Sequence, residues 1–378
     1  MLPRSMFTEE HEMFREQVRR FAEREIAPHH DQWEKDGIVS REVWAAAGEH
    51  GLLCTTLSPE YGGPGGDFLH ATIVIEELAK IGASGPAFHL HSDIVAPYIV
   101  AYGNEDQKKE WLPKMVRGET IAAVAMSEPG GGSDLQGIQT RAIRDGNHFV
   151  INGQKVFISN GQIADLVVLA CKTDPKERAK GVSLVLVEGD RAGFRRGRNL
   201  EKVGYKAQDT SELFFEDCRV PITNLLGEEG RGFAQLMTEL AQERLVVALR
   251  SAQIIETALD WTIEYTRERK AFGRAIAEFQ NTRFKLAEIK TKAMVTRAFI
   301  DQCLTLHMAG KLDSNTAAAA KLHATDTLCE VLDECVQLHG GYGYMWEYPI
   351  ARAWADARMT RIAGGTSEIM KEIISRAL

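Results

Sequence analysis

Residues 126–140 read MSEPGGGSDLQGIQT and follow a short apolar run at residues 121–125. The Glu128-Pro129 dipeptide and the glycines at positions 130–132 exclude a continuing helix and a plain central strand. We therefore expect a tight loop with bare backbone N–H groups, against which a flat polar ligand could lie. Taken alone, the pattern favours an ordinary surface turn between strands, because glycine-rich loops are common.

The residues after this loop have the pattern of a small β domain. Short β-branched or apolar runs between turn residues indicate strands at 148–151, 166–170, 182–187 and 213–215. Asp145-Gly146-Asn147 and Asn152-Gly153 are hairpin-type signals. The charged segment 172–180 is expected to be an exposed loop.

The residues before the loop read as helices. Side chains at positions 7, 11, 14, 18 and 21 recur at helical spacing, and Pro28 is expected to end that helix. Further helices are expected near Trp44 and over residues 73–81 and 94–102. Ser92 or Asp93 is the expected N-cap of the last of these. Pro113 is expected to close the region.

From residue 229 to the end the chain again reads as helical. The pattern predicts helices over 231–267, 282–308, 314–338, 350–360 and 367–377, with a connecting loop at 270–279. The expected fold class is therefore α+β. It comprises an N-terminal α-helical domain (1–119), a middle β domain (120–228) and a C-terminal α-helical domain (229–378).

The composition is that of an ordinary globular protein, with 44% hydrophobic and 26% charged residues. A formal charge of −8 argues against a general nucleic-acid binder. No apolar run is long enough to predict a membrane span, and the start lacks the apolar core of a secretory signal. The six cysteines include no C-x-x-C pair, so they read as reduced thiols in a reducing compartment and no metal site is expected.

Four further motifs accompany the glycine loop. They are INGQKVFISNG (151–161), ERKAFGRAIAEFQ (268–280), QLHGGYGYMWEYPIAR (337–352) and GGTSEIMKE (364–372). With these five segments in the family's order, the chain resembles the acyl-CoA dehydrogenase family over nearly its whole length. It looks most similar to the long-chain branch, through QERL at 242–245, KLDS at 311–314 and the motifs ending the chain.

The resemblance implies a β domain between two helical domains, usually assembled as a homotetramer with FAD bound. It implies FAD-dependent dehydrogenation of a medium- or long-chain or branched acyl-CoA to the trans-2-enoyl-CoA, as in fatty acid β-oxidation. The electrons would pass to an electron-transferring flavoprotein. The location would be cytoplasmic, or the mitochondrial matrix if the protein is eukaryotic and processed.

One carboxylate falls on the apolar stripe of a predicted helix. Glu243 lies three residues after Leu240 and four before Val247, so the three side chains share a face. An unpaired carboxylate there would cost roughly several kcal/mol or shift its pKa. Spacing alone favours a buried ion pair with Arg244 or another arginine, because catalytic carboxylates are few.

The resemblance assigns Glu243 another role. Most family members carry the base that removes the α-proton just before a Gly-Thr pair, where this chain has Gly364. The long-chain and isovaleryl branches place it instead in a segment like Gln242-Glu243-Arg244-Leu245. Glu243 is thus the expected base, and Gly364 can still offer its backbone N–H to the thioester carbonyl.

The remaining site residues follow from the same resemblance. Ser133, Arg244, Ala363, Gly364 and Gly365 match positions on the acyl-CoA side, and the small residues Ala363 and Gly364 should leave room near the reacting carbons. The expected FAD contacts are Met126, Ser127, Ser133, Phe157, Ser159, Arg269, Phe272, Gln280, Gln337, Gly340, Gly341, Thr366 and Glu368.

These FAD contacts fall into groups. Those between positions 126 and 159 would lie along the flavin ring. Those at 269–280 and 337–341 would reach the FAD of a neighbouring subunit, and Thr366 and Glu368 would contact phosphate and adenosine near a helix N-terminus. Without the resemblance, Phe157 reads as strand core, Arg269 as a solvated helix end and Thr366 as an N-cap.

Two other functions compete with a dehydrogenase. An acyl-CoA oxidase would use oxygen, although oxidases of this superfamily usually carry a long C-terminal extension and this chain stops at Leu378. A flavin- or acyl-CoA-binding relative without catalysis is raised by Gly364, and Glu243 argues against it.

Overall fold

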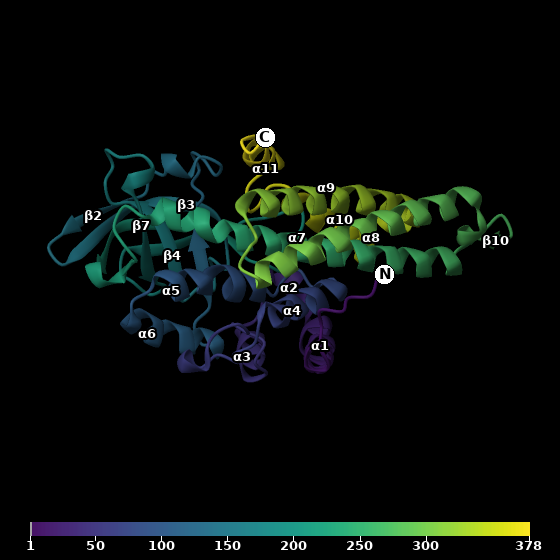
Figure 1. Ribbon diagram of the computed structural model, residues 1–378, viewed down its shortest axis with the longest axis horizontal. Helices are drawn as coiled ribbons and strands as arrows, with labels where there is room; N and C mark the ends of the chain where they lie inside the picture. Colours follow the sequence, from purple (N-terminus) through teal and green to yellow (C-terminus); the bar gives the residue numbers. More distant parts are fainter. Residues whose placement is uncertain (1) are drawn as a thin grey trace.

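The protein is described by a computed structural model that covers residues 2–378 (Figure 1). Six α-helices come first: α1 (Glu9–Phe21), α2 (Ala27–Asp36), α3 (Arg41–Glu49), α4 (Phe68–Lys80), α5 (Ala96–Tyr102) and α6 (Glu105–Val116). Thr8 caps α1, Asp67 caps α4 and Asn104 caps α6, each through its side-chain oxygen. The expected N-terminal helical region is confirmed.

Two helix ends predicted from proline were wrong. Pro28 does not end the first helix, because a π-helical turn at Ala22–Ile26 leads directly into α2 and Pro28 occupies its first turn. The π-helical turn, in which the N–H of Ala27 donates to the carbonyl of Ala22, leads into the proline without a break in the helix. Pro113 lies inside α6, between Leu112 and Met115, both of which are fully buried.

The predicted N-cap before α5 was also wrong. Leu90–Val95 form a π-helix that runs without a break into α5, so Ser92 and Asp93 lie within a helix. The hydroxyl of Ser92 instead accepts a hydrogen bond from the backbone N–H of Cys54, at 2.9 Å.

An eight-stranded sheet follows, in the order β6-β7-β3-β2-β4-β5-β8, and β1 pairs with β4 in parallel. Its strands are β1 (Ala122–Ala125), β2 (Arg141–Asp145), β3 (His148–Ser159), β4 (Leu166–Lys172), β5 (Val182–Glu188), β6 (Phe194–Asn199), β7 (Thr210–Pro221) and β8 (Leu225–Leu226). The four predicted strands are confirmed. The hairpin at Asp145-Gly146-Asn147 joins β2 to β3, with Asp145 opposite His148.

The second predicted hairpin, at Asn152-Gly153, was wrong. Both residues lie inside β3, where the register with β7 shifts between Ile151 and Gly153. A Cβ on Gly153 would lie 2.5 Å from the hydroxyl oxygen of Thr140. Glycine therefore permits close backbone approach at an irregular strand rather than a turn. In the charged segment 172–180, most residues are exposed as expected, but Lys172 is buried and donates to the carbonyls of Glu177 and Arg178.

The rest of the chain is helical, as predicted. Its elements are α7 (Gly232–Glu268), the short strands β9 (Lys270–Ala271) and β10 (Arg274–Ala275), α8 (Gln280–Met308), α9 (Ser314–His339), α10 (Pro349–Thr360) and α11 (Ser367–Ser375). At 37 residues α7 is about 55 Å long. It begins beside the sheet and extends to the far end of the molecule, where β10 lies (Figure 1). In residues 2–378 no helix is long and apolar enough to cross a membrane.

A buried ion-pair network joins the two helical regions. Arg297 on α8 pairs with Glu76 on α4 at 2.8 Å and with Glu256 on α7 at 2.6 Å. Arg4 and Arg15 also pair with Glu76. Burial raises the pKa of Glu76, but the three arginines outweigh this effect and hold its pKa below the usual value.

Removing one partner of this network should be costly. Arg297→Met would leave Glu76 and Glu256 without their central cation, and we expect a loss of about 3–5 kcal/mol in the free energy of unfolding. Lys292→Met is the matched control, because Lys292 is also on α8 and pairs with Glu330 on α9, but both side chains are exposed. It should cost about 0–1 kcal/mol in urea unfolding. Equal losses in the two variants would contradict the account.

Candidate functional site

Glu243 lies in the first half of α7 and is 7% exposed. Its Oε1 accepts a hydrogen bond of 2.7 Å from the hydroxyl of Tyr98 on α5. Its Oε2 has no hydrogen-bond partner among residues 2–378. Burial raises the pKa of Glu243 to about 7, against smaller lowering effects of Tyr98 and Arg244. The carboxyl can therefore exchange a proton near neutral pH, with Oε2 as the free atom.

The buried ion pair favoured by spacing is not formed. Arg244 is 3% exposed, and its Nη1 donates to the hydroxyl of Ser314 at 2.9 Å. Its Nε is buried without a partner in the described part of the chain. No cation of residues 2–378 lies within ion-pair distance of Glu243, so the carboxyl is stabilised mainly by a neutral hydroxyl.

Gly364 lies next to the helix face that carries Glu243. A Cβ on Gly364 would have one neighbour within 4 Å, the side chain of Val247, which lies one turn after Glu243 on α7. Ala363, Gly364 and Gly365 are all partly exposed, and the two glycines have φ of 67° and 97°. Over the described residues, the N–H of Gly364 has no hydrogen-bond partner, so it is available to an acceptor.

A buried lysine holds this loop. Lys321 on α9 is fully buried, and its Nζ donates to the carbonyl of Gly365 at 2.7 Å. Burial lowers the pKa of Lys321 to about 8. The bond fixes the peptide between Gly365 and Thr366 and so holds the loop that carries Gly364.

The glycine loop is tied to the sheet at its base. Glu128 accepts hydrogen bonds from the N–H groups of Gln139 and Thr140 and pairs with the buried Lys155 at 2.8 Å. Lys155 also donates to the carbonyl of Met126. The exposed tip at residues 130–133 thus stands on a buried, fully paired base.

The first two predicted FAD segments lie side by side. The N–H of Val156 donates to the carbonyl of Ser127 at 3.0 Å, which joins the loop to β3 just before Phe157. Phe157 is exposed and has φ of 62°, where the register with β7 shifts again. It is therefore not strand core, and a strained, exposed aromatic residue of this kind is often functional. Met126, Ser127 and Ser159 are partly exposed, and Ser133 is exposed.

A second group of predicted residues lies at the other end of α7. Arg269 is the C-cap of α7, and its guanidinium lies 5.5 Å from the ring centre of Tyr342, which follows Gly340 and Gly341. Phe272 is 95% exposed at the tip of the β9–β10 turn, close to Gln280 at the start of α8. Gln337, on the last turn of α9, is exposed at the same end.

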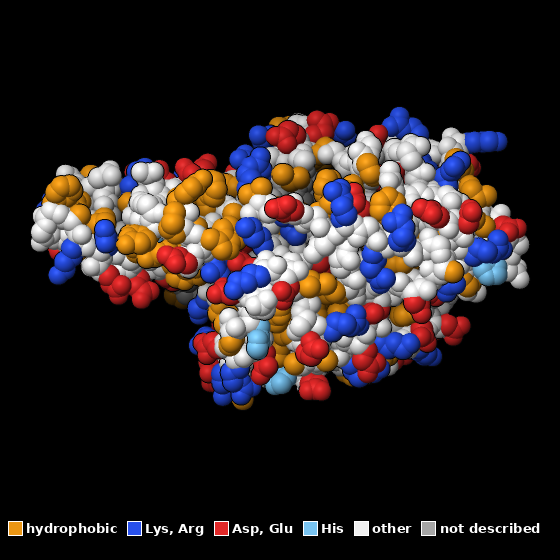
Figure 2. All heavy atoms as spheres, turned by 180° about the vertical axis from the view of Figure 1, so that it is seen from behind, with side chains coloured by type: hydrophobic (Ala, Val, Ile, Leu, Met, Phe, Trp, Pro, Cys, Tyr) orange, Lys and Arg blue, Asp and Glu red, His pale blue; other side chains and the backbone are white. Residues whose placement is uncertain are grey.

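The two groups are far apart within one chain. Glu243 and Arg269 are separated by 26 residues of one helix, which corresponds to about 39 Å. Figure 2 shows hydrophobic side chains gathered over the narrow end of the molecule that carries the second group. The exposed apolar residues of this end include Phe272, Phe284 and Tyr344. One chain alone does not bring the two groups together.

Thr366 is the N-cap of α11, as the alternative explanation predicted. Its hydroxyl accepts a hydrogen bond from the N–H of Ile369, at 3.3 Å. Glu368 is exposed in the first turn of the same helix. Both residues directly follow the loop that carries Gly364.

Sequence reasoning missed three contacts that build the site. Tyr98 lies 145 positions before Glu243, Lys155 lies 27 after Glu128 and Lys321 lies 44 before Gly365. No local pattern links these pairs. The one signal available for Lys155 and Lys321 was a lysine within an apolar or alanine-rich run.

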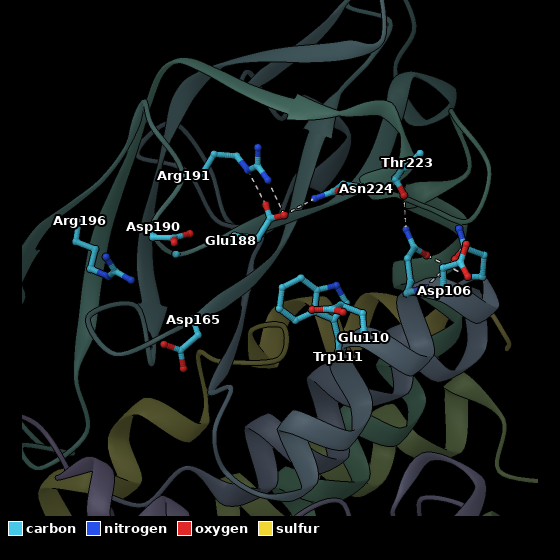
Figure 3. Close-up of a pocket in the computed structure, with 13 residues that line it drawn as sticks. Asp106, Glu110, Trp111, Asp165, Glu188, Asp190, Arg191, Arg196, Thr223 and Asn224 are labelled. Atoms are coloured by element: carbon cyan, nitrogen blue, oxygen red, sulfur yellow. Dashed lines mark hydrogen bonds and ion pairs between the residues drawn. The ribbon is translucent and has the colours of Figure 1, made fainter.

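An open cavity of about 1100 Å³ lies elsewhere, between α6 and the β5–β6 side of the sheet (Figure 3). Its polar side chains mostly satisfy one another: Glu188 binds Arg191 through two hydrogen bonds and also accepts from Asn224. None of the predicted site residues lines it, and Glu243 is not among its lining residues.

Known proteins resemble this chain along its full length. It matches the N-terminal, middle and C-terminal domains of acyl-CoA dehydrogenases over residues 8–119, 123–218 and 230–378. It is 52% identical to the long-chain specific acyl-CoA dehydrogenase, mitochondrial, of Sus scrofa, over 99% of this chain and 88% of that protein.

Solved structures agree. An acyl-CoA dehydrogenase from Geobacillus kaustophilus superposes with a TM-score of 0.97 at 50% identity, covering 98% of both chains. A glutaryl-CoA dehydrogenase from Mycobacterium smegmatis, solved in complex with FADH2, gives a TM-score of 0.91 at 26% identity. That match covers 99% of this chain and 95% of the other.

The raised pKa of Glu243 should be visible in the stability of the fold. Because its folded pKa exceeds its unfolded value, Glu243 destabilises the protein progressively as the pH rises from about 4.5 to about 7. Glu243→Gln removes this effect. Between these pH values its free energy of unfolding should therefore rise by about 3 kcal/mol relative to that of the wild type.

The control is Glu368→Gln. The pKa of Glu368 is lowered by its own backbone N–H and by Thr366. The Glu368→Gln variant should therefore become less stable than the wild type as the pH rises. Chemical unfolding of all three proteins at several pH values gives the comparison. A pH-independent difference between wild type and Glu243→Gln would rule out the raised pKa.

Proposed function

This chain belongs to the acyl-CoA dehydrogenase family and is an acyl-CoA dehydrogenase, and on that premise we propose FAD-dependent α,β-dehydrogenation of a medium- or long-chain or branched acyl-CoA. The product is the trans-2-enoyl-CoA, and electron-transferring flavoprotein is the proposed acceptor. The observation that carries the proposal is the buried carboxyl of Glu243, which has no ion pair among residues 2–378 and lies one turn before Val247, the neighbour of Gly364.

The residues present fit FAD as the resident cofactor. The N–H groups of Gly130, Gly132 and Ser133 have no hydrogen-bond partner in the described chain. Phe157 offers an exposed ring on the strand that is joined to this loop through Val156 and Ser127. We propose that Met126, Ser127, Ser133, Phe157 and Ser159 hold the flavin end, with Thr366 and Glu368 toward the phosphates and adenosine. When bound, FAD supplies the acceptor for the β-hydrogen, which leaves as hydride.

Glu243 then acts as the base for the α-proton. Its Oε2 takes the proton, while Tyr98 holds Oε1 and so fixes the plane of the carboxyl group. With a pKa near 7 the carboxyl is substantially ionised at neutral pH and still basic enough to accept a proton. Burial by α5 and α7 keeps water away from the forming carbanion.

Gly364 contributes through its backbone. Its free N–H is proposed to donate to the thioester carbonyl, where negative charge develops as the α-proton leaves. Lys321 supports this role indirectly because it anchors the next carbonyl in the chain. Arg244, Ala363, Gly365 and Ser133 are proposed as further acyl-CoA contacts, and the small side chains at 363–365 leave space for a branch near the reacting carbons.

We propose that the working unit is a homotetramer. The residues at the far end of α7, Arg269, Phe272 and Gln280, are about 39 Å from Glu243 along the helix and cannot complete its site within one chain. Gln337, Gly340 and Gly341 lie beside them. A second copy would bring this end, with its exposed apolar side chains, onto the FAD of the first. The proposed location is cytoplasmic, or the mitochondrial matrix in a processed eukaryotic form.

Removing Arg269 should weaken FAD binding without harming the fold. The purified protein should be yellow, with one non-covalent FAD per subunit, and Arg269→Ala should lose FAD more readily on dilution because a guanidinium suits a pyrophosphate. Arg274→Ala is the control on the same exposed hairpin. Flavin absorbance measures the FAD occupancy, and sedimentation measures the oligomeric state. A monomer with full FAD occupancy would contradict a FAD site shared between subunits.

Replacing Glu243 should abolish most of the activity and spare cofactor binding. Glu243→Gln keeps the shape and removes the proton acceptor, so anaerobic flavin reduction by acyl-CoA should slow by at least about 10²–10⁴. Near wild-type reduction would disprove the assignment. The double variant Glu243→Gly with Gly364→Glu restores a carboxylate at the other position from which the α-carbon can be reached. The positive φ of Gly364 strains any other residue there. We therefore expect partial recovery of the rate of flavin reduction.

A further inference from the structure

Two neighbouring rows of side chains run along the π-helix and the start of α5, the helix that supplies Tyr98 to Glu243. Side chains four apart lie on nearly the same side of such a helix, so His89, Asp93 and Pro97 form one row and Leu90 and Ile94 a neighbouring one. His89, Leu90, Ile94 and Pro97 keep accessible surface, whereas the opposite side of the helix is closely packed. π-Helical turns are frequent at functional sites.

Asp93 is a buried carboxyl that the fold does not use. It is 5% exposed, and its side chain makes no hydrogen bond or ion pair with any residue from 2 to 378. Burial alone raises its pKa to about 8. The nearby thiol of Cys54 does not stabilise the ionised form of Asp93, because burial and then Asp93 raise the pKa of that thiol as well. A carboxyl in this position lowers the stability of the protein.

His89 lies one turn before Asp93 and is also without a partner among the described residues. Burial lowers its pKa to about 3, with a smaller contribution from Arg250. His89 as a residue is partly exposed, and Asp93 is buried. They are two polar side chains, one turn apart, that the described part of the fold leaves without a hydrogen-bond partner.

The π-helix lies against the part of α7 that carries Glu243. The side-chain amide of Gln242 donates to the backbone carbonyl of Asp93, at 2.7 Å. Ile94 packs against a core that includes Leu245 and Leu249 of α7. The π-helix therefore packs on the segment of α7 that carries Glu243, and the same helical run continues into Tyr98, whose hydroxyl binds that carboxyl.

We propose that Asp93, with His89 beside it, is a polar subsite for a hydrogen-bonding group, such as a hydroxyl, on the acyl chain of the substrate. The inference rests on the function proposed above and names its substrate class: acyl-CoAs oxygenated beyond the β-carbon. A hydroxyl donates to an oxygen of the Asp93 carboxyl group and accepts from the imidazole N–H of His89. A plain aliphatic chain leaves both groups dry and unpaired.

The test compares acyl-CoAs of matched length with and without one hydroxyl, placed in turn along the chain beyond the β-carbon. With an artificial electron acceptor, the wild type should favour at least one hydroxylated compound by about 10-fold or more in kcat/KM. Asp93→Leu should abolish that preference and use the plain chain at least as well. An unchanged ratio in Asp93→Leu, or no preference at any position in the wild type, would overturn the proposal.

Thermal unfolding separates a ligand role from a structural one. Asp93→Leu should raise the Tm, because it removes an unpaired buried carboxyl. Asp209→Leu is the control: Asp209 is equally buried but accepts a hydrogen bond from the N–H of Gln162, so its loss should lower the Tm. A lower Tm for Asp93→Leu would show that the fold uses the group.

The two proposals fail in different ways. If neither plain nor hydroxylated acyl-CoA bleaches the flavin of the wild type, the proposed dehydrogenation is wrong. The Asp93 subsite is then still decided by whether hydroxylated acyl-CoA raises the Tm of the wild type more than the plain compound does, and whether Asp93→Leu removes that difference. If plain acyl-CoA is oxidised and neither ratio nor Tm responds to Asp93→Leu, only the subsite is wrong.

Discussion

The hydrogen bond between Tyr98 and Glu243 joins the N-terminal helices to the C-terminal helices at the proposed reaction centre. It satisfies one carboxyl oxygen with a neutral hydroxyl and leaves the other free. An arginine in its place would lower the pKa of Glu243 and remove its basicity, whereas no partner at all would cost the fold more. The helices therefore have to bring a hydroxyl, and no cation, within reach of a dry carboxyl.

The length of α7 organises the remaining residues. It carries Glu243 near the sheet and Arg269 at the far end, and the ion-pair network of Arg297 with Glu76 and Glu256 holds its middle against α4 and α8. A rigid helix of about 55 Å keeps these two positions at a fixed separation. In the proposed tetramer each chain would offer one half of a FAD site at each end, and association of identical chains would complete both halves.

The fold was largely predictable from sequence, because hydrophobic periodicity and β-branched runs determine which segments form helices and strands. The errors arose where local rules have exceptions: Pro28 and Pro113 fit into helices, Asn152-Gly153 marks an irregular strand, and a π-helix passes through Ser92 and Asp93. Spacing located Glu243 on a buried face but favoured the wrong partner, Arg244. The correct one, Tyr98, is 145 residues away, and tertiary packing alone brings it close.

The pH dependence of flavin reduction tests the central claim most directly. Under anaerobic conditions the rate of flavin bleaching by acyl-CoA should rise with pH through about 7, as Glu243 loses its proton. Tyr98→Phe removes the hydrogen bond that favours the ionised carboxyl, so the rise should move to higher pH while the limiting rate at high pH is largely kept. A profile that is flat around neutrality, or one that Tyr98→Phe leaves in place, would contradict the account.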